Sequence, residues 1–239
     1  MKKITQAVIL AGGMGVRLRP FTNDRPKIMV DVAGRPFAEY LLDELKRNGI
    51  EKVVFLLGYL PEKIQEHFGD GSAFGLKITY LVTPLEDSTG TRVRKAKELL
   101  DDYFLLMYCD NYLSLDLPAI TAVHFEKNPL LTMTVYTNKH GITKNNLIVG
   151  ADGYIEKYDK KREAPGLSGV DMGFFIADKK LLEQMPEGDF WLYDLFPKLI
   201  ADKQLAGYKT DELYYSVGSL ARLEQTRAFF SSRDKQEKN

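Results

Sequence analysis

A glycine-rich turn with two basic residues is the part of this sequence best suited to chemistry. It reads Leu10-Ala11-Gly12-Gly13-Met14-Gly15-Val16-Arg17-Leu18, and Pro26-Lys27 follows soon after. Glycines let backbone N–H groups approach an oxyanion closely, and Arg17 and Lys27 add positive charge beside those groups. The spacing therefore predicts a loop that holds phosphates.

Two common phosphate loops do not fit this spacing. The P-loop needs a glycine, four further residues and then Gly-Lys-Ser/Thr, which this turn lacks. The dinucleotide fingerprint needs a third glycine where this chain has Leu18. A plain strand-to-helix turn remains the alternative for the glycines taken alone. The basic residues favour the phosphate loop.

Asp110 is the second candidate for chemistry, because it follows the most continuous apolar run of the chain, Tyr103–Tyr108. A carboxylate that faces phosphates suits Mg²⁺, which takes one or two carboxylates and completes its octahedron with phosphate oxygens and water. Taken alone, Asp110-Asn111 reads equally well as a turn that ends a strand. Since ligands of open α/β sheets bind beyond the carboxyl ends of the strands, we expect Arg17 and Asp110 to share one cleft.

Alternating strands and helices must position these residues. Hydrophobic periodicity predicts strands at 7–10, 52–57, 76–82 and 103–108, and helices at 37–48, 61–68, 91–100 and 220–230. This alternation indicates an α/β fold, a Rossmann-like, mostly parallel mixed sheet flanked by helices. From residue 130 to 158 the pattern changes to strands and turns, which predicts a smaller antiparallel lobe. Residues 231–239 form a polar tail that we expect to fray.

Composition narrows the function further. The chain has 239 residues, a formal net charge of +0 and 44% hydrophobic residues, which predicts a single domain over 1–239. Balanced charge argues against a nucleic-acid partner. Cys109 is the one cysteine, and His67, His124 and His140 lack zinc-like spacing. With no secretory signal and no apolar run of membrane length, we expect a cytoplasmic protein without a membrane partner.

The turn resembles the signature of the sugar-1-phosphate nucleotidyltransferases, Leu-Ala-Gly-Gly-x-Gly-x-Arg-Leu followed by Pro-Lys. The resemblance implies that the chain condenses an NTP with a sugar-1-phosphate to give an NDP-sugar and pyrophosphate. It implies catalytic roles for Arg17, Lys27 and Asp110, with Mg²⁺ on Asp110. The implied nucleotide-binding residues, within a nucleotide-binding half at 1–129, are Leu10, Ala11, Gly12, Gly13, Gly15, Thr89 and Gly90.

The same resemblance implies a sugar-phosphate-binding half at 130–230. Tyr158-Asp159-Lys160-Lys161 and Val170-Asp171-Met172-Gly173 are similar to the family's sugar-phosphate site, an acidic-lysine pair followed by an Asp-containing glycine segment. Either Lys160 or Lys161 corresponds to the lysine that binds the sugar phosphate. Asp159, Asp171 and Gly173 are the other implied residues of this site. Without the resemblance these residues read as a charged loop. Within the family, the Tyr-Asp-Lys and Asp-x-Gly patterns are most similar to those of enzymes that activate manno-heptose 1-phosphate with GTP.

Two residues depart from the family pattern. Arg92 stands near the base pocket where the family has a small residue, and Ser216 stands where many members have an aspartate that completes the metal site. They motivate an alternative, a non-catalytic sensor of nucleotides or sugar phosphates. A glycosyltransferase of similar topology would require an Asp-x-Asp motif after a strand, but the chain has Asp110-Asn111-Tyr112 at that place. The expected partners are the two substrates, and a homodimer is compatible with the resemblance.

Overall fold

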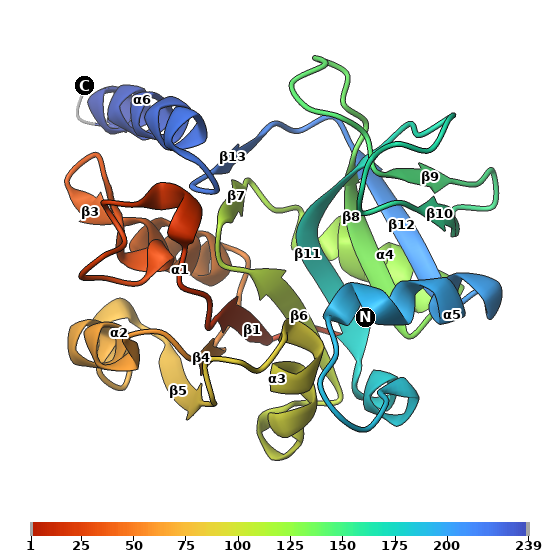
Figure 1. Ribbon diagram of the computed structural model, residues 1–239, viewed down its shortest axis with the longest axis horizontal. Coiled ribbons are helices and arrows are strands. Elements are labelled where there is room, and N and C mark those ends of the chain that lie inside the picture. The colour runs from red at the N-terminus through yellow and green to blue at the C-terminus, as the bar shows by residue number, and fades with distance from the viewer. Residues whose placement is uncertain (1, 238–239) are drawn as a thin grey trace.

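A seven-stranded mixed sheet forms the centre of the computed structural model, which describes residues 2–237 (Figure 1). The strand order is β12-β8-β11-β6-β1-β4-β5. All neighbouring pairs are parallel except the two made by β11, which runs antiparallel to both β6 and β8. The strands are β1 (Gln6–Ala11), β4 (Lys52–Leu57), β5 (Lys77–Val82), β6 (Tyr103–Tyr108), β8 (Leu131–Tyr136), β11 (Val170–Asp178) and β12 (Leu205–Thr210).

Both faces of this sheet are covered, which explains the continuous apolar runs of its strands. In β1, Ala7 and Ile9 belong to one hydrophobic core and Val8 and Leu10 to the other. The first core includes residues of α1 (Phe37–Arg47), α2 (Pro61–Phe68), α4 (Leu117–Lys127) and α6 (Leu220–Glu237). The second includes residues of α3 (Thr89–Lys95) and α5 (Phe196–Ala201). The sheet is thus a rigid layer between two layers of helices.

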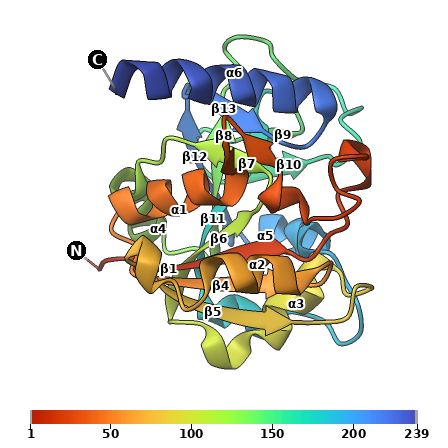
Figure 2. The ribbon, with the colours of Figure 1, turned by 90° about the vertical axis from the view of Figure 1, so that its left-hand side faces the viewer.

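Three small antiparallel sheets surround the central one. They pair β9 (Leu147–Val149) with β10 (Ile155–Tyr158), β7 (Asn111–Leu113) with β13 (Tyr214–Ser216), and β2 (Asp31–Val32) with β3 (Arg35–Pro36). Helix α6 contacts both β13 and β2 and lies along one end of the molecule (Figure 2). Because β7 follows Asp110 directly and pairs with β13, the β7–β13 sheet brings the C-terminal part of the chain to that aspartate.

The predicted fold class is confirmed, with differences at particular segments. The predicted strands 52–57 and 103–108 and the helix 61–68 have the observed bounds. The predicted helix 91–100 is instead α3 followed by a separate 3₁₀ turn at Lys97–Leu99, and α6 continues to Glu237, past the predicted end at residue 230. Residues 238 and 239 of the expected tail lie outside the described residues. Within residues 2–237, no helix has the length and apolar character needed to cross a membrane.

Candidate active site

The glycine turn and Asp110 meet at the carboxyl edge of the sheet. The turn follows β1, Asp110 follows β6, and these two strands are parallel neighbours. Two cavities open at this edge, and both are lined by Tyr108 and Asp110. We call them the glycine-loop cavity, of about 420 Å³, and the Asp171 cavity, of about 510 Å³. Asp110 is therefore positioned between two adjoining binding spaces.

Local geometry explains the shape of the turn. Gly15 has φ 62°, a left-handed conformation that favours glycine, and it precedes a 3₁₀ turn at Val16–Leu18. The hydroxyl of Thr22 donates to the carbonyl of Gly15 at 2.9 Å. A Cβ atom added at Gly13 would meet nothing within 4 Å. The hydrogen bond from Thr22 thus fixes the turn at Gly15, while Gly13 leaves open space for a ligand.

Lys27 and Asp110 form an ion pair at the junction of the cavities, with Nζ and Oδ2 separated by 2.8 Å. Burial alone would raise the pKa of Asp110, but the charge and hydrogen bond of Lys27, with the charge of Arg17, outweigh burial and hold that pKa below its usual value. Burial also raises the pKa of the adjacent Cys109 thiol to about 12. The junction therefore holds a carboxylate and no thiolate nucleophile.

The glycine-loop cavity contains most of the predicted nucleotide-binding residues. It is lined by Leu10, Gly12, Gly13, Gly15, Lys27, Leu85, Glu86, Asp87, Thr89, Arg92, Tyr108, Cys109, Asp110 and Trp191. Ala11 and Gly90 do not line it. Ala11 is buried in the sheet core, and a Cβ at Gly90 would overlap the ring of Phe190, so Gly90 permits close packing of α3.

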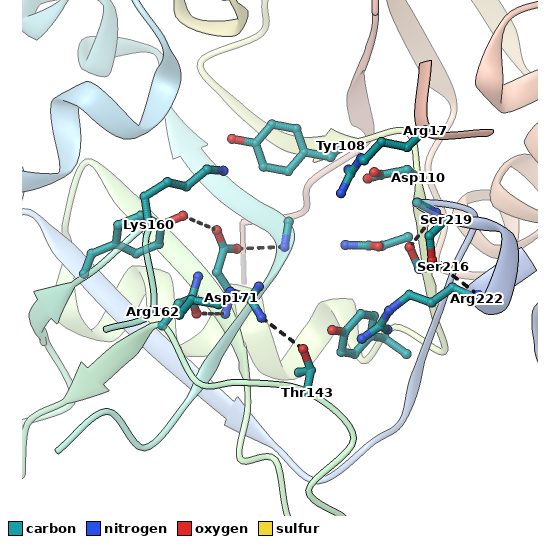
Figure 3. Close-up of a pocket in the computed structure, with 16 residues that line it drawn as sticks. Arg17, Tyr108, Asp110, Thr143, Lys160, Arg162, Asp171, Ser216, Ser219 and Arg222 are labelled. Atoms are coloured by element: carbon teal, nitrogen blue, oxygen red, sulfur yellow. Dashed lines mark hydrogen bonds between the residues drawn. The ribbon is translucent and has the colours of Figure 1, made fainter. Parts of the chain in front are cut away.

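Asp171 lies on the opposite side of the second cavity from Asp110 and Arg17 (Figure 3). A register shift in β11 follows Asp171, where Gly173 has φ 78° and donates its N–H to Asp171 Oδ1 at 2.8 Å. The hydroxyl of Tyr158 donates to Oδ2 at 3.3 Å. Burial raises the pKa of Asp171 to about 6, although the Gly173 N–H, the charge of Lys160 and the Tyr158 hydrogen bond each act to lower it.

The lining of the Asp171 cavity separates the two candidate lysines. Lys160 lines the cavity, and its Nζ lies 4.8 Å from the centre of the Tyr193 ring, whereas Lys161 does not line it. Asp159 is outside the lining as well. Its carboxylate accepts hydrogen bonds from the backbone N–H groups of Lys161, Glu163 and Ala164, so it shapes the loop that carries Lys160.

Several residues of this cavity were not found from the sequence. Arg162 and Arg222 line it, with Tyr108, Asn146 and Tyr214. Arg162 donates to Thr143 Oγ1 at 2.9 Å and to the carbonyl of Lys144 at 2.7 Å. The guanidinium carbon of Arg222 lies 5.3 Å from the centre of the Tyr214 ring. Their positions depend on the pairing of distant segments, so no local pattern identified them.

Asp110 would be the carboxylate ligand of a magnesium ion at this site. Within residues 2–237, no group of three or more His, Cys, Asp or Glu side chains could hold a metal ion. Ser216 Oγ accepts the N–H of Gly218 at 3.0 Å, and a Cβ on Gly218 would lie 3.7 Å from Asp110 Oδ2. Asp110 thus supplies one carboxylate with a hydroxyl near it, a donor set that suits Mg²⁺ only when phosphates and water complete it.

A mostly parallel sheet thus carries a glycine-rich turn and a buried carboxylate at its carboxyl edge, with a cavity on each side of that carboxylate. The chain belongs to the nucleotidyl transferase family, whose model matches residues 6–232. It is 29% identical over 213 residues to a UTP–glucose-1-phosphate uridylyltransferase of Synechocystis, covering 82% of this chain and 55% of that protein. It is 26% identical over 216 residues to a D-glycero-alpha-D-manno-heptose 1-phosphate guanylyltransferase of Aneurinibacillus thermoaerophilus, covering 89% of this chain and 93% of that one.

Solved structures agree with this fold. A putative glucose-1-phosphate thymidylyltransferase from Bacillus anthracis superposes with a TM-score of 0.83 at 18% identity, covering 94% of each chain. HddC from Yersinia pseudotuberculosis superposes with a TM-score of 0.78 at 21% identity, covering 95% of this chain and 100% of that one. The comparisons therefore establish family and fold.

Proposed function

We propose that the protein is a sugar-1-phosphate nucleotidyltransferase that condenses an NTP with a sugar-1-phosphate to give an NDP-sugar and pyrophosphate. One observation carries the proposal, namely the two cavities that adjoin at Asp110 and Tyr108. The glycine-loop cavity offers backbone N–H groups and Lys27 to a triphosphate. The Asp171 cavity offers Lys160, a carboxylate and two arginines to a phosphorylated sugar.

The reaction needs positioning more than it needs a base. A phosphate monoester has a second pKa near 6, so at neutral pH the sugar phosphate is already an oxyanion nucleophile. Its oxygen attacks the α-phosphorus of the NTP, the new P–O bond forms, and the bond to the bridging oxygen breaks so that pyrophosphate leaves with that electron pair. The barrier lies in aligning two anions and stabilising the leaving group.

Side chains that line the two cavities align the substrates and stabilise the leaving group. Arg17 lines the Asp171 cavity beside Asp110, where it can contact both the attacking phosphate and the α-phosphate. Lys27 and the amides of the glycine turn bind the triphosphate on the other side of Asp110. Lys160 binds the sugar phosphate, and Asp171 accepts hydrogen bonds from sugar hydroxyls. Asp110 would hold Mg²⁺, which when bound offsets the charge of the triphosphate.

GTP with a manno-heptose 1-phosphate is the first substrate pair to test, since it is supported by the residues Tyr158 to Lys161 and by the guanylyltransferase relative. The experiment measures pyrophosphate release with Mg²⁺ and four NTPs against several sugar-1-phosphates. Release with at least one pair, together with a detectable NDP-sugar, supports the proposal. Binding of ligands without release across the whole panel would instead support a sensor, the alternative that the Ser216 hydroxyl favours.

A further inference from the structure

The wall of the glycine-loop cavity is held by a buried arginine. Arg92 lies in the first turn of α3 and is 3% exposed. Its Nε donates to the carbonyl of Asp87 at 3.0 Å, and Nη2 donates to the carbonyls of Pro84 and Leu85 at 2.9 and 3.1 Å. All three carbonyls belong to the loop that connects β5 to α3.

The remaining donors of Arg92 reach the sheet. Nη1 donates to the carbonyl of Leu57, at the carboxyl end of β4, at 2.7 Å and also to the hydroxyl of Thr83. A Cβ at Gly12 or at Gly58 would overlap or press against the guanidinium, so both glycines make room for it. Every N–H of this guanidinium therefore has an acceptor, and the loop 84–87 is fastened to the sheet beside the glycine turn.

This attachment determines what the loop offers to a ligand. In a planar trans peptide the C=O and N–H groups point in opposite directions. Because the carbonyls of Pro84 and Leu85 point to Arg92, the N–H groups of Leu85 and Glu86 point away from it, and neither has an acceptor within the described chain. The loop thus keeps two backbone donors available.

Glu86 adds a carboxylate to the same wall. It lines the glycine-loop cavity and makes no hydrogen bond or ion pair with any residue that the structure describes. Its neighbour Asp87 differs, since its carboxylate pairs with Lys95 at 2.6 Å. Trp191 is 48% exposed and lines the cavity as well, and its ring, which stacks on Tyr193 with the ring centres 5.9 Å apart, can also stack on a base.

We propose that Glu86 is the specificity-determining residue for the base, that the base is guanine, and that Arg92 is the positioning residue that presents Glu86. This assignment rests on the proposed nucleotidyltransferase function. Guanine carries two adjacent donors, N1–H and the N2 amino group, next to the O6 acceptor. A carboxylate pairs with both donors, and a backbone N–H pairs with O6. Adenine, cytosine and uracil lack two adjacent donors on the base-pairing edge.

Binding of GTP and ITP tests the assignment, because inosine lacks only the N2 amino group. Affinities are measured by titration calorimetry and by the fluorescence of Trp191, the one tryptophan of the chain. We expect the intact protein to bind GTP about tenfold or more tightly than ITP, since a hydrogen bond to a charged group is lost with inosine. Glu86→Gln should bring the two affinities close to each other. Glu98→Gln, the same change at an exposed residue outside both cavities, should leave the ratio unchanged.

Arg92→Ala tests the positioning role and should also reduce the GTP/ITP ratio, with melting and circular dichroism showing whether the variant folds. Equal affinity for GTP and ITP in the intact protein, or a ratio that survives Glu86→Gln, overturns the assignment. Turnover of another NTP in preference to GTP overturns it while the proposed function stands. Selective GTP binding through Glu86 without turnover of any sugar phosphate supports the base assignment and overturns the proposed function.

Discussion

Replacing Asp171 by Asn should make the protein more stable above pH 6 and a poorer enzyme. The carboxylate lines the Asp171 cavity, and burial raises its pKa to about 6 from 3.8. The folded protein therefore binds this proton more tightly than the unfolded chain. The stability contributed by the protonated group is fully present below pH 3.8, decreases as the pH rises, and is lost once the pH passes about 6.

The size of this effect follows from the shift. A shift of about two pKa units at about 1.4 kcal/mol per unit corresponds to about 3 kcal/mol of lost folding free energy. Water in the cavity screens the partly accessible carboxylate, so we expect a gain of about 1–2 kcal/mol in the variant at pH 8. Asn keeps an oxygen that can accept the N–H of Gly173, so the hydrogen bond to the backbone is conserved.

Urea denaturation at pH 5 and pH 8 measures the effect. Asp159→Asn is the matched control with the opposite sign, because backbone N–H groups of Ala164 and Glu163 lower the pKa of Asp159 and its charge is stabilised by the fold. At pH 8 we expect Asp171→Asn to be stabilised, Asp159→Asn to be destabilised, and only the former to show a KM for the sugar phosphate raised at least severalfold. Destabilisation of both variants at pH 8 would refute the reasoning about Asp171.

Three other outcomes are expected. Asp110→Ala should reduce pyrophosphate release by about a hundredfold or more while circular dichroism remains near wild type and the melting temperature falls, because Lys27 loses its ion-pair partner; a normal rate at saturating Mg²⁺ would exclude a role in metal binding. Lys160→Ala should raise the KM for the sugar phosphate about tenfold, whereas Lys161→Ala should not; equal effects would remove the distinction that the cavity makes between them. Gly90→Ala should destabilise the protein by about 1–3 kcal/mol in thermal unfolding, because the new methyl group overlaps Phe190, and an unchanged melting temperature would contradict that packing.

The central sheet could be predicted from sequence because its strands are short, apolar and separated by amphipathic helices. Tyr103–Tyr108 is buried on both faces, and its end places Asp110 at the ligand edge. The antiparallel lobe was expected to begin at residue 130, but β8 joins the central sheet beside β11. That pairing joins segments far apart in sequence, so alternation along the chain gives no signal for it.

The site shows the same division between local and distant information. Arg17, Lys27 and Asp110 carry local signals, a glycine turn and a strand end, and the structure brings all three together. Arg162, in the loop between β10 and β11, and Arg222, in α6, have no local sequence signal, and only the fold brings them to one cavity. Arg92 departs from the small residue of the family pattern, and its structural role depends on five acceptors that the fold brings together from the end of β4, from Thr83 and from the loop 84–87.

The reversed direction of β11 has a consequence for how such a protein can diversify. Strand β8 ends, and β11 begins, at the edge where Asp110 lies, because Tyr136 pairs with Val170. Residues 137–169 therefore leave and rejoin the scaffold at the reaction centre, and they carry Asn146, Lys160 and Arg162. Substitutions among the residues of this segment that line the Asp171 cavity would change that cavity alone, whereas Leu147 and Ile155 of the same segment are buried in the second core and tie it to the sheet.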